Sequence, residues 1–406
     1  MFLAAGNHPP KKQRLSDTGA VAMSLYSNAL AGLAAILMLP GQVDRQRDFG
    51  PAHTDFATVA LAALAGSGPG DVTLAVSDRP TGDGSSSSPD CKIPHSSLLK
   101  RYRVRPSWRV AGVDYCVGYP ATKALKDPAT LSMPGVTIDE AHKIITVTRN
   151  GIVVDGYDFS RDGGWGVSVR AKDVSILNSR FVVGSNANPP IRGTEEAANL
   201  TVAYTLVDGR GIDVGNFGLI QMKGRGLSVR YCWIANSAGD SIQSHNGGVL
   251  DLRYNLIEQG GLAPGAHGDF LEVFAGPFQA TILYNTTYQH SGGEGGNQGL
   301  MLEPDFQDKP GIIALGEYGN NTLIATGGHQ NYLIGITAND IVDAVNVHDN
   351  FFDASGTYGF VRGGKNTATP NDLNPKTIFT HNVNMRTGAV VQDRRQPAAL
   401  PPRSSR

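Results

Sequence analysis

The chain has 406 residues, of which 50 are glycine and 17% are charged, and its formal net charge is −1. A charge this close to zero creates no overall basic field, which excludes a protein that attracts nucleic acid or an anionic membrane through its net charge. The many glycines suit a fold with many tight turns.

Three cysteines cannot all pair with one another. Cys91 and Cys116 flank the same region ahead of the repeats and can form a disulfide in an oxidising compartment. Cys232 occupies a repeat position that elsewhere holds Asn, Thr or Ser, so we interpret it as a packed thiol. The sequence contains no CxxC motif and no His/Cys spacing typical of a metal site.

Residues 1–55 are expected to be a leader without defined structure. The basic stretch Lys11–Arg14 precedes an apolar run over residues 20–40, a pattern typical of a secretory signal. Polar residues interrupt the apolar run, which argues against a membrane-spanning helix. We therefore expect a secreted, periplasmic or cell-surface protein. The alternative to a secretory signal is a leader that is merely unstructured, or a misplaced start codon.

The next segment, Phe56–Gly66, contains helix-forming apolar residues and is expected to cap one end of the fold. A second signal-like segment is the rival interpretation. Gly68-Pro-Gly-Asp71 follows, and then a strand is expected over Val72–Val76. Residues 91–135 are irregular, and the sequence predicts no structure for them.

An eight-residue figure, with apolar residues alternating with polar ones, recurs along the rest of the chain. Copies begin at residues 152, 174, 200, 227, 250, 280, 316, 345 and 377, between 22 and 36 residues apart. Repeats of this length indicate a solenoid, and the alternation indicates strands rather than helices. Uneven spacing favours a constant strand core with loops of variable length.

Each repeat divides into three short strands. In one copy these are Leu250–Arg253, Leu256–Ile257 and Phe270–Val273, with a Gly-rich loop, Gln259–Gly268, before the third. The predicted fold is therefore all-β: a right-handed parallel β-helix with three strands per turn and turns ~4.8 Å apart. We expect it to span residues 56–390, followed by a disordered tail over residues 391–406.

The corner between the first two strands of each copy holds an asparagine in five successive repeats. Asn tolerates the left-handed backbone that a sharp corner needs, and stacked amides can bond to one another from turn to turn. At ~1 kcal/mol net for each bond, such an asparagine ladder would help to fix the register. The five residues are Asn255, Asn285, Asn321, Asn350 and Asn382.

These corner asparagines, the Pro-Gly-Asp opening and the repeat length are similar to those of right-handed parallel β-helix proteins of the pectin lyase-like superfamily. The resemblance covers roughly residues 56–390. It implies a substrate groove along the strand that follows the long loop, here over residues 218–303. The superfamily includes polysaccharide lyases, hydrolases, epimerases and non-catalytic proteins, so the fold alone does not determine activity.

On that strand, the apolar third residue of each copy should point inward, which leaves a polar column outside. Ser168 extends this column and Glu303 lies just past it. Such a column suits hydrogen bonding to a sugar chain, and it equally suits an ordinary solvated strand face. Its members are Gln221, Gln243, Glu272 and Met301.

Asp240 and Asp269 fall at matching positions one turn apart, so their backbones are expected ~5 Å apart. Two carboxylates that close can act as an acid–base or acid–nucleophile pair, as in glycoside hydrolases. Together with Glu272 they could instead bind Ca²⁺. The structural alternative is a pair of turn residues that accept backbone N–H bonds. Their surroundings loosely resemble polygalacturonase motifs, but the sequence has no adjacent Asp-Asp pair and no Arg-Ile-Lys.

Further candidates lie near this pair. His267, in the Gly-rich loop, and His245, one turn earlier, suit proton transfer near neutral pH, although a lone loop histidine is more often simply solvated. Lys223 is placed to neutralise a uronate or act as a base, whereas Arg253 lies on the first strand, away from the groove. Trp165 is expected either to stack on a sugar ring or to cap an early turn.

The sequence predicts an exported β-helix protein that binds or acts on polysaccharide, by hydrolysis or by β-elimination of a uronate. As an enzyme it would use Asp240 and Asp269 as the carboxyl pair, Glu272 to assist, and His267 or His245 to transfer a proton. Gln221 and Gln243 would bind sugar hydroxyls. The alternative is a non-catalytic surface protein of the adhesin type.

Overall fold

The computed structural model describes residues 93–391 except residues 216, 293–296, 303–311, 327–329, 337–339, 354–356, 358 and 364–375. The chain divides into two compact units, Met1–Thr81 and Gly82–Arg406, and every described residue belongs to the second. The expected leader, the capping segment Phe56–Gly66, the strand Val72–Val76 and residues 392–406 of the expected tail lie outside the described residues.

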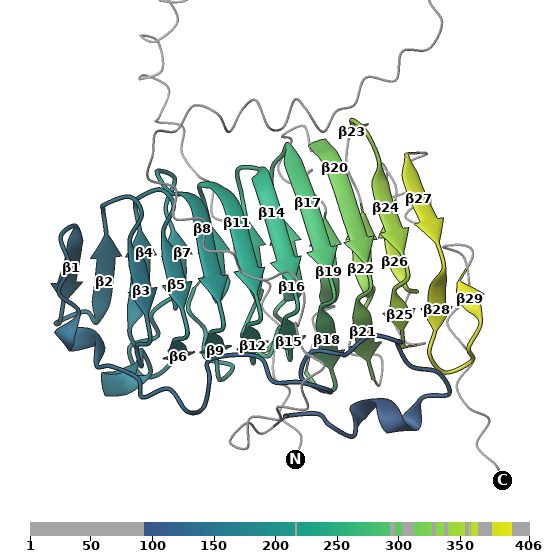
Figure 1. Ribbon diagram of the computed structural model, residues 1–406, viewed down its shortest axis with the longest axis horizontal. Coiled ribbons are helices and arrows are strands. Elements are labelled where there is room, and N and C mark those ends of the chain that lie inside the picture. The colour runs from purple at the N-terminus through teal and green to yellow at the C-terminus, as the bar shows by residue number, and fades with distance from the viewer. Residues whose placement is uncertain are drawn as a thin grey trace, which may run out of the picture. The chain divides into compact units, whose positions relative to one another are not determined.

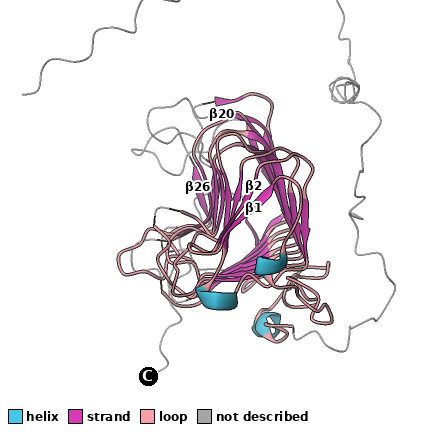
Figure 2. Cartoon of the chain, turned by 90° about the vertical axis from the view of Figure 1, so that its left-hand side faces the viewer, coloured by secondary structure: helices cyan, strands magenta, loops and turns pink. Residues whose placement is uncertain are grey.

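Short strands stack into three sheets that form the sides of one coil (Figures 1 and 2). Sheet 1 contains β1 Val136–Asp139, β2 Ile144–Val147, β4 Gly166–Val169, β7 Ile191–Gly193, β10 Ile220–Met222, β13 Ile242–Ser244, β16 Asp269–Val273, β19 Gln298–Leu302, β22 Ile334–Ile336 and β26 Val361–Gly363.

Sheet 2 contains β3 Val153–Asp155, β5 Ser175–Leu177, β8 Ala198–Ala203, β11 Arg225–Arg230, β14 Gly248–Arg253, β17 Phe278–Leu283, β20 Ile312–Gly319, β24 Val345–His348 and β27 Thr377–Thr380, with β23 Asp340–Ile341 beside β20. Sheet 3 contains β6 Arg180–Val182, β9 Leu206–Asp208, β12 Trp233–Ala235, β15 Leu256–Glu258, β18 Thr286–Gln289, β21 Thr322–Ala325, β25 Phe351–Phe352, β28 Asn382–Asn384 and β29 Val390–Val391.

From β5 to β26, each turn visits sheet 2, sheet 3 and sheet 1 in that order, so the predicted three-strand repeat is confirmed. All pairings are parallel except β1 with β2 and β28 with β29, the two pairings at the ends of their sheets. The described helices are three single 3₁₀ turns: η1 Leu98–Arg101, η2 Pro128–Thr130 and η3 Arg161–Gly163. Within the described ranges, none is long or apolar enough to cross a membrane.

The register of sheet 2 matches the repeat found in the sequence. Leu227 pairs with Leu200 on one side and with Leu250 on the other, and the later copies continue the series one turn at a time. The further aligned starts are Ala280, Gly316, Val345 and Thr377. A constant strand core with variable loops is therefore what the chain builds.

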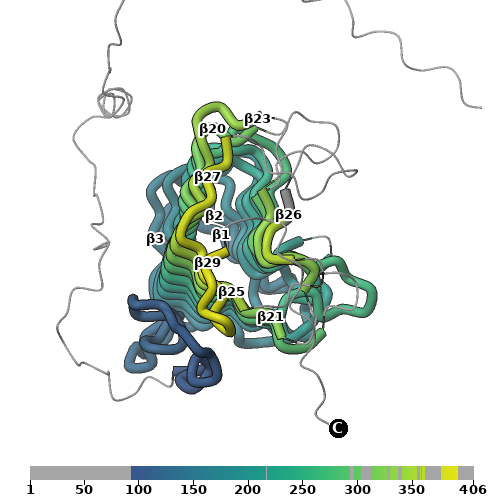
Figure 3. Tube along the Cα trace, turned by 90° about the vertical axis from the view of Figure 1, so that its right-hand side faces the viewer, coloured from purple at the N-terminus to yellow at the C-terminus, as the bar shows by residue number. Residues whose placement is uncertain are grey.

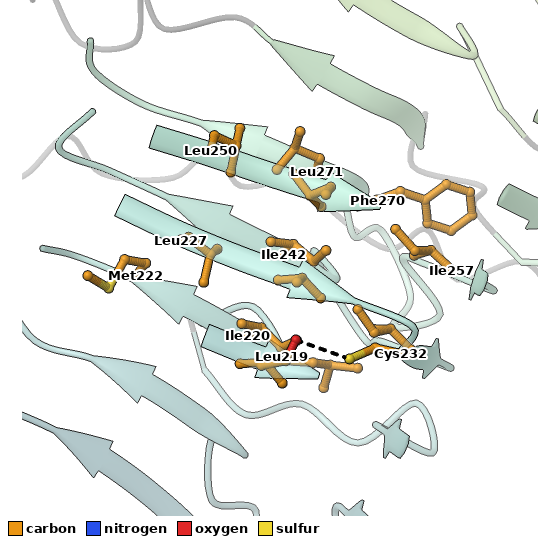
Figure 4. Packing of buried hydrophobic residues seen from close by; sticks show 14 of the residues in the cluster. Leu219, Ile220, Met222, Leu227, Cys232, Ile242, Leu250, Ile257, Phe270 and Leu271 are labelled. Atoms are coloured by element: carbon orange, nitrogen blue, oxygen red, sulfur yellow. Dashed lines mark hydrogen bonds between the residues drawn. The ribbon is translucent and has the colours of Figure 1, made fainter. Parts of the chain in front are cut away.

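Apolar side chains from all three sheets fill the inside of the coil as one continuous core. Figure 4 shows part of this core, where Ile242 and Leu271 of sheet 1 lie near Leu227 and Leu250 of sheet 2. All four side chains are 0–1% exposed. Because the turns repeat, burial in one turn continues into the next, and the core is as long as the coil.

The predicted asparagine ladder is confirmed. Asn255 Nδ2 donates to Asn285 Oδ1 at 2.9 Å, and the same bond recurs from Asn285 to Asn321, to Asn350 and to Asn382 at 2.9–3.0 Å. Each of these oxygens also accepts the backbone N–H of the asparagine one turn earlier. The ladder therefore ties the corners of five successive turns.

The sequence suggested that the asparagine at each corner has the left-handed backbone conformation. In the structure, the residue before the asparagine has it. Tyr254, Tyr284, Asn320, Asp349 and His381 have φ between 52° and 60°. This arrangement places the asparagine side chain inside the corner, where its amide is buried. The preceding side chain points outward, and the tyrosines at this position stack on one another with ring centroids 4.8–5.1 Å apart.

Residues 93–131, for which the sequence predicted no structure, form a strap across the outside of the coil. The strap begins beside the middle turns, where His95 bonds to Glu258, and reaches the last turns where Val104 N–H donates to Met385 O. It then runs back to the first turns, where Lys126 lies over Tyr157 (Figures 1 and 3). Trp108 packs edge-on against Tyr284 and Phe351. The strap therefore joins both ends of the coil.

Buried carboxylates anchor the strap to sheet 3. The Tyr102 hydroxyl donates to Asp353 at 2.8 Å, and Arg386 Nε donates to the other oxygen of the same carboxylate at 2.5 Å. Burial, and then the neighbouring Asp353, raise the pKa of Tyr102. In the middle of the same sheet, His95 bonds to Glu258 of β15. Each contact joins residues far apart in sequence, which explains why no local pattern predicted the strap.

Cys232 is a free, fully buried thiol, as predicted. Its Sγ donates to the Val202 carbonyl at 3.5 Å, the dashed bond in Figure 4, and its backbone N–H donates to Asn255 Oδ1. Cys116 is disulfide-bonded. Cys91, its expected partner, lies outside the described residues.

Replacing one rung of the ladder is expected to destabilise the fold strongly. Asn285→Ala removes four hydrogen bonds made by the side chain, and at about 1 kcal/mol for each bond the free energy of unfolding should fall by about 4 kcal/mol. Urea unfolding measures the change. Asn346→Ala, on the outward side of β24, is the control and should have little effect. Equal losses in the two variants would contradict the ladder's role.

Cys232 is expected to resist modification in the folded protein. Burial raises the pKa of its thiol from 9.0 to about 12, so very little thiolate, the reactive form, exists at pH 8. Peptide mass mapping after alkylation should find Cys232 unmodified in buffer and modified in urea. Because the folded pKa is the higher one, this thiol should also reduce the free energy of unfolding as pH rises from about 9 towards 12. Rapid labelling of the native protein at pH 8 would contradict this burial.

Candidate functional site

The polar column predicted on the outside of sheet 1 exists. Gln221 pairs with Gln243, and Gln243 with Glu272, on three successive strands, and Met301 follows on β19. In the other direction Gln221 pairs with Arg192, which pairs with Ser168. We call Arg192, Gln221, Gln243 and Glu272 the outward column. It crosses four turns of the coil, on strands β7, β10, β13 and β16 (Figure 1).

The sequence suggested that the two glutamines face solvent, but both are buried. Gln221 and Gln243 are 1% and 7% exposed. Gln221 Nε2 donates to Gln243 Oε1 at 2.6 Å, and Gln243 Nε2 donates to Asp240 Oδ2 at 2.7 Å. Their amides therefore form a bonded floor that holds neighbouring side chains in place. Met301 is also buried, at 1% exposure, and offers no polar group.

Asp240 and Asp269 lie one turn apart, as predicted, because Ile242 pairs with Leu271. Asp240 Oδ1 accepts the backbone N–H of Asp269 at 2.8 Å, while its Oδ2 accepts from Gln243. Both oxygens of Asp240 thus accept hydrogen bonds within the turn. This is the structural role that the sequence offered as the alternative to catalysis. The Asp269 carboxyl is almost fully buried, with 4% of its side chain exposed.

The two histidines do not form a pair. His245 follows β13 at its carboxyl end, whereas His267 precedes β16 at its amino end, so they lie at opposite ends of the sheet 1 strands. The His245 ring stacks on Phe274 with centroids 4.1 Å apart, and its Nε2 is 3.4 Å from Gln221 Nε2. His267 is 56% exposed, with Nδ1 3.8 Å from Asp269 Oδ1.

The remaining candidate residues lie in different parts of the fold. Lys223 lies on the outside of sheet 1, with Nζ 5.8 Å from the Phe217 ring centroid. Trp165 is 2% exposed and packs in the core, with Lys143 over its ring, so it presents no face to a sugar. Arg253 bonds to Asp251 on sheet 2, away from the column as expected. Glu303 lies outside the described residues.

Sequence reasoning missed three side chains on this face. Phe274 is two residues past Glu272, just as Lys223 and His245 are two residues past Gln221 and Gln243, so the repeat itself could have found it. Arg192 could likewise have been found by aligning β7 with β10. Phe217 lies in a loop, and only the structure places it under the Arg192 guanidinium, with Cζ 4.8 Å from the ring centroid.

The face offers half-buried Glu272, His245 and Phe274 above the glutamine floor. A carboxylate and an imidazole can exchange hydrogen bonds with hydroxyl groups, and a ring can stack on an apolar sugar face. Among the described residues, no group of three His, Cys, Asp or Glu side chains is arranged to hold a metal ion. Asp240, Asp269 and Glu272 therefore do not form the calcium cluster considered from the sequence.

Comparison with known proteins gives no match: no protein-family model, curated protein or solved structure is similar to this chain. The candidate site therefore rests on its own geometry.

Asp240 is expected to tolerate a change that keeps one acceptor. Asp240→Asn retains an oxygen for the Asp269 N–H but turns an NH₂ group towards the Gln243 amide, so it should lower the free energy of unfolding by less than Asp240→Ala does. Asp240→Ala leaves the Asp269 N–H and the Gln243 amide without an acceptor, and should lower it by about 1–3 kcal/mol. Urea unfolding distinguishes the two. If both variants were as stable as the wild type, the turn would not depend on this carboxylate.

Proposed function

We propose that this chain is an exported polysaccharide-binding protein of the pectin lyase-like kind, and that the outer face of β10, β13 and β16 is its binding surface. The observation that carries the proposal is the register of the outward column, which repeats polar side chains once per turn along the coil. A polymer with a repeating unit is the natural ligand for a surface that repeats every ~4.8 Å.

The side chains on this face have the chemistry that sugar recognition needs. Glu272 and His245 are half-buried, which holds them in place and leaves them reachable. The stacked His245–Phe274 rings add an apolar platform.

Export is supported by the disulfide at Cys116, because disulfides persist in oxidising compartments. The basic stretch followed by an apolar run, over residues 11–40, supports it from the sequence.

A second candidate function is cleavage of the bound glycan, by hydrolysis or by β-elimination. The observation in its favour is exposed His267, whose Nδ1 is 3.8 Å from the buried Asp269 carboxyl. A carboxyl group beside an imidazole can orient it for proton transfer. Asp240 is a weaker candidate for chemistry, because both its oxygens accept bonds within the turn.

The binding proposal predicts a selective loss in Glu272→Gln. A hydrogen bond from a hydroxyl to a charged group contributes about 1.5–3 kcal/mol, so affinity should fall about tenfold to a hundredfold. Glycan-array binding and then titration of the best ligand provide the measurement. Glu317→Gln makes the same change on sheet 2 and should bind like the wild type.

The same incubations decide between binding and cleavage. New reducing ends without unsaturated products indicate hydrolysis, and unsaturated products indicate β-elimination. Both should disappear in His267→Ala if that imidazole moves the proton. Binding without products leaves a non-catalytic surface protein. Absence of binding to every glycan in a broad panel would reject the proposal.

A further inference from the structure

Two cations converge on one aromatic ring at the first turns of the outward column. The Arg192 guanidinium Cζ is 4.8 Å from the Phe217 ring centroid, and Lys223 Nζ is 5.8 Å from the same centroid. Arg192 lies on β7 and Lys223 directly follows β10, the next strand of sheet 1. We call these three residues the cationic cluster.

Neither cation is neutralised within the part of the chain that the structure describes. No described carboxylate forms an ion pair with Arg192 or Lys223, and Arg192 Nε is buried without a hydrogen-bond acceptor. On sheet 2, by contrast, Arg230 and Arg253 both bond to Asp251. A buried donor left without a partner costs free energy, and two unpaired cations beside one ring repel each other. An anion bound near both cations would reduce their mutual repulsion.

We propose that the cationic cluster is a subsite for an oxyanion substituent of the glycan, a carboxylate or a sulfate ester. This inference rests on the proposed function. The guanidinium fork can hold two oxygens of such a group, and the ammonium of Lys223 adds a point charge. The Phe217 ring holds both cations on the outer side of sheet 1 through cation–π attraction.

The column changes sign along the coil, and this restricts the ligand further. Arg192 lies on β7 and Lys223 directly follows β10, whereas Glu272 lies on β16, three strands from β7 and two from β10, roughly 10–14 Å away at the usual strand spacing. A polymer charged on every unit would meet repulsion from the Glu272 carboxylate. The ligand is therefore a largely neutral glycan with widely spaced anionic groups, one of which binds at the cationic cluster.

The test compares glycans that share a backbone and differ in charge. Each is prepared with sparse carboxylates, with sparse sulfates, with its anionic groups removed, and with an anionic group on every unit. Wild-type protein should bind one sparsely charged form at least tenfold more tightly than the neutral and the fully charged forms. The preferred arm identifies the oxyanion. Arg192→Gln and Lys223→Gln should each remove this preference.

Arg225→Gln is the matched control, because Arg225 is an exposed cation on sheet 2, two residues past Lys223. It should retain the preference. Arg192→Lys keeps the charge and removes the fork, so it should restore the preference only in part. Equal binding of the neutral and charged forms by wild-type protein would overturn the inference and leave the proposed function standing. An equal loss in Arg225→Gln would also overturn it, since the effect would then come from net charge.

Inorganic sulfate is a second probe that needs no glycan. It should raise the thermal midpoint of the wild type and of Arg225→Gln by more than that of Arg192→Gln. Such protection without binding of any glycan would support the anion subsite and reject the proposed function. An equal effect of sulfate on all three proteins, together with no preference among glycans, would reject the subsite.

Discussion

Hydrogen bonds between side chains of successive turns set the register on which the rest of this molecule depends. In the asparagine ladder, each amide donates to the next and each carbonyl also accepts a backbone N–H, so a turn that slipped by one residue would lose several bonds at once. The tyrosines stacked outside the same corner follow the same register. Because the three strands of a turn are connected, alignment at this corner also aligns sheet 1 and its outward column.

The strap adds a constraint of a different kind. Neighbouring turns contact only one another, as in any solenoid, whereas the strap touches both the last and the first turns. Its contacts bury the carboxyl groups of Asp353 and Glu258 and cover the outside of sheet 3. Antiparallel pairs at two sheet ends, β1 with β2 and β28 with β29, complete the coil. Sheet 1 is left as the face on which the candidate site lies.

On that face, some polar side chains are buried and have a structural role, whereas others are partly exposed and can contact a ligand. The glutamines and Asp240 bond to one another and to the backbone, and Gln221 lies beside the His245 ring. The charges are arranged along the coil axis, with cations over β7 and β10 and carboxyl groups near β16. A repeating scaffold makes such a gradient simple to build, since one substitution per turn changes one step of the surface.

The sequence by itself determined the solenoid, the three strands per turn, the ladder and the partners of each strand, because these follow from alternation and from repeats that align one turn on the next. The adjacency of Asp240 and Asp269 followed from the same alignment. Only the tertiary structure decided that Gln221 and Gln243 are buried, that Trp165 belongs to the core, and that Phe217 lies beneath Arg192. The strap was likewise invisible in the sequence. Exposure, loop placement and contacts between distant segments depend on how loops of unequal length cover neighbouring turns, and no periodic pattern encodes that.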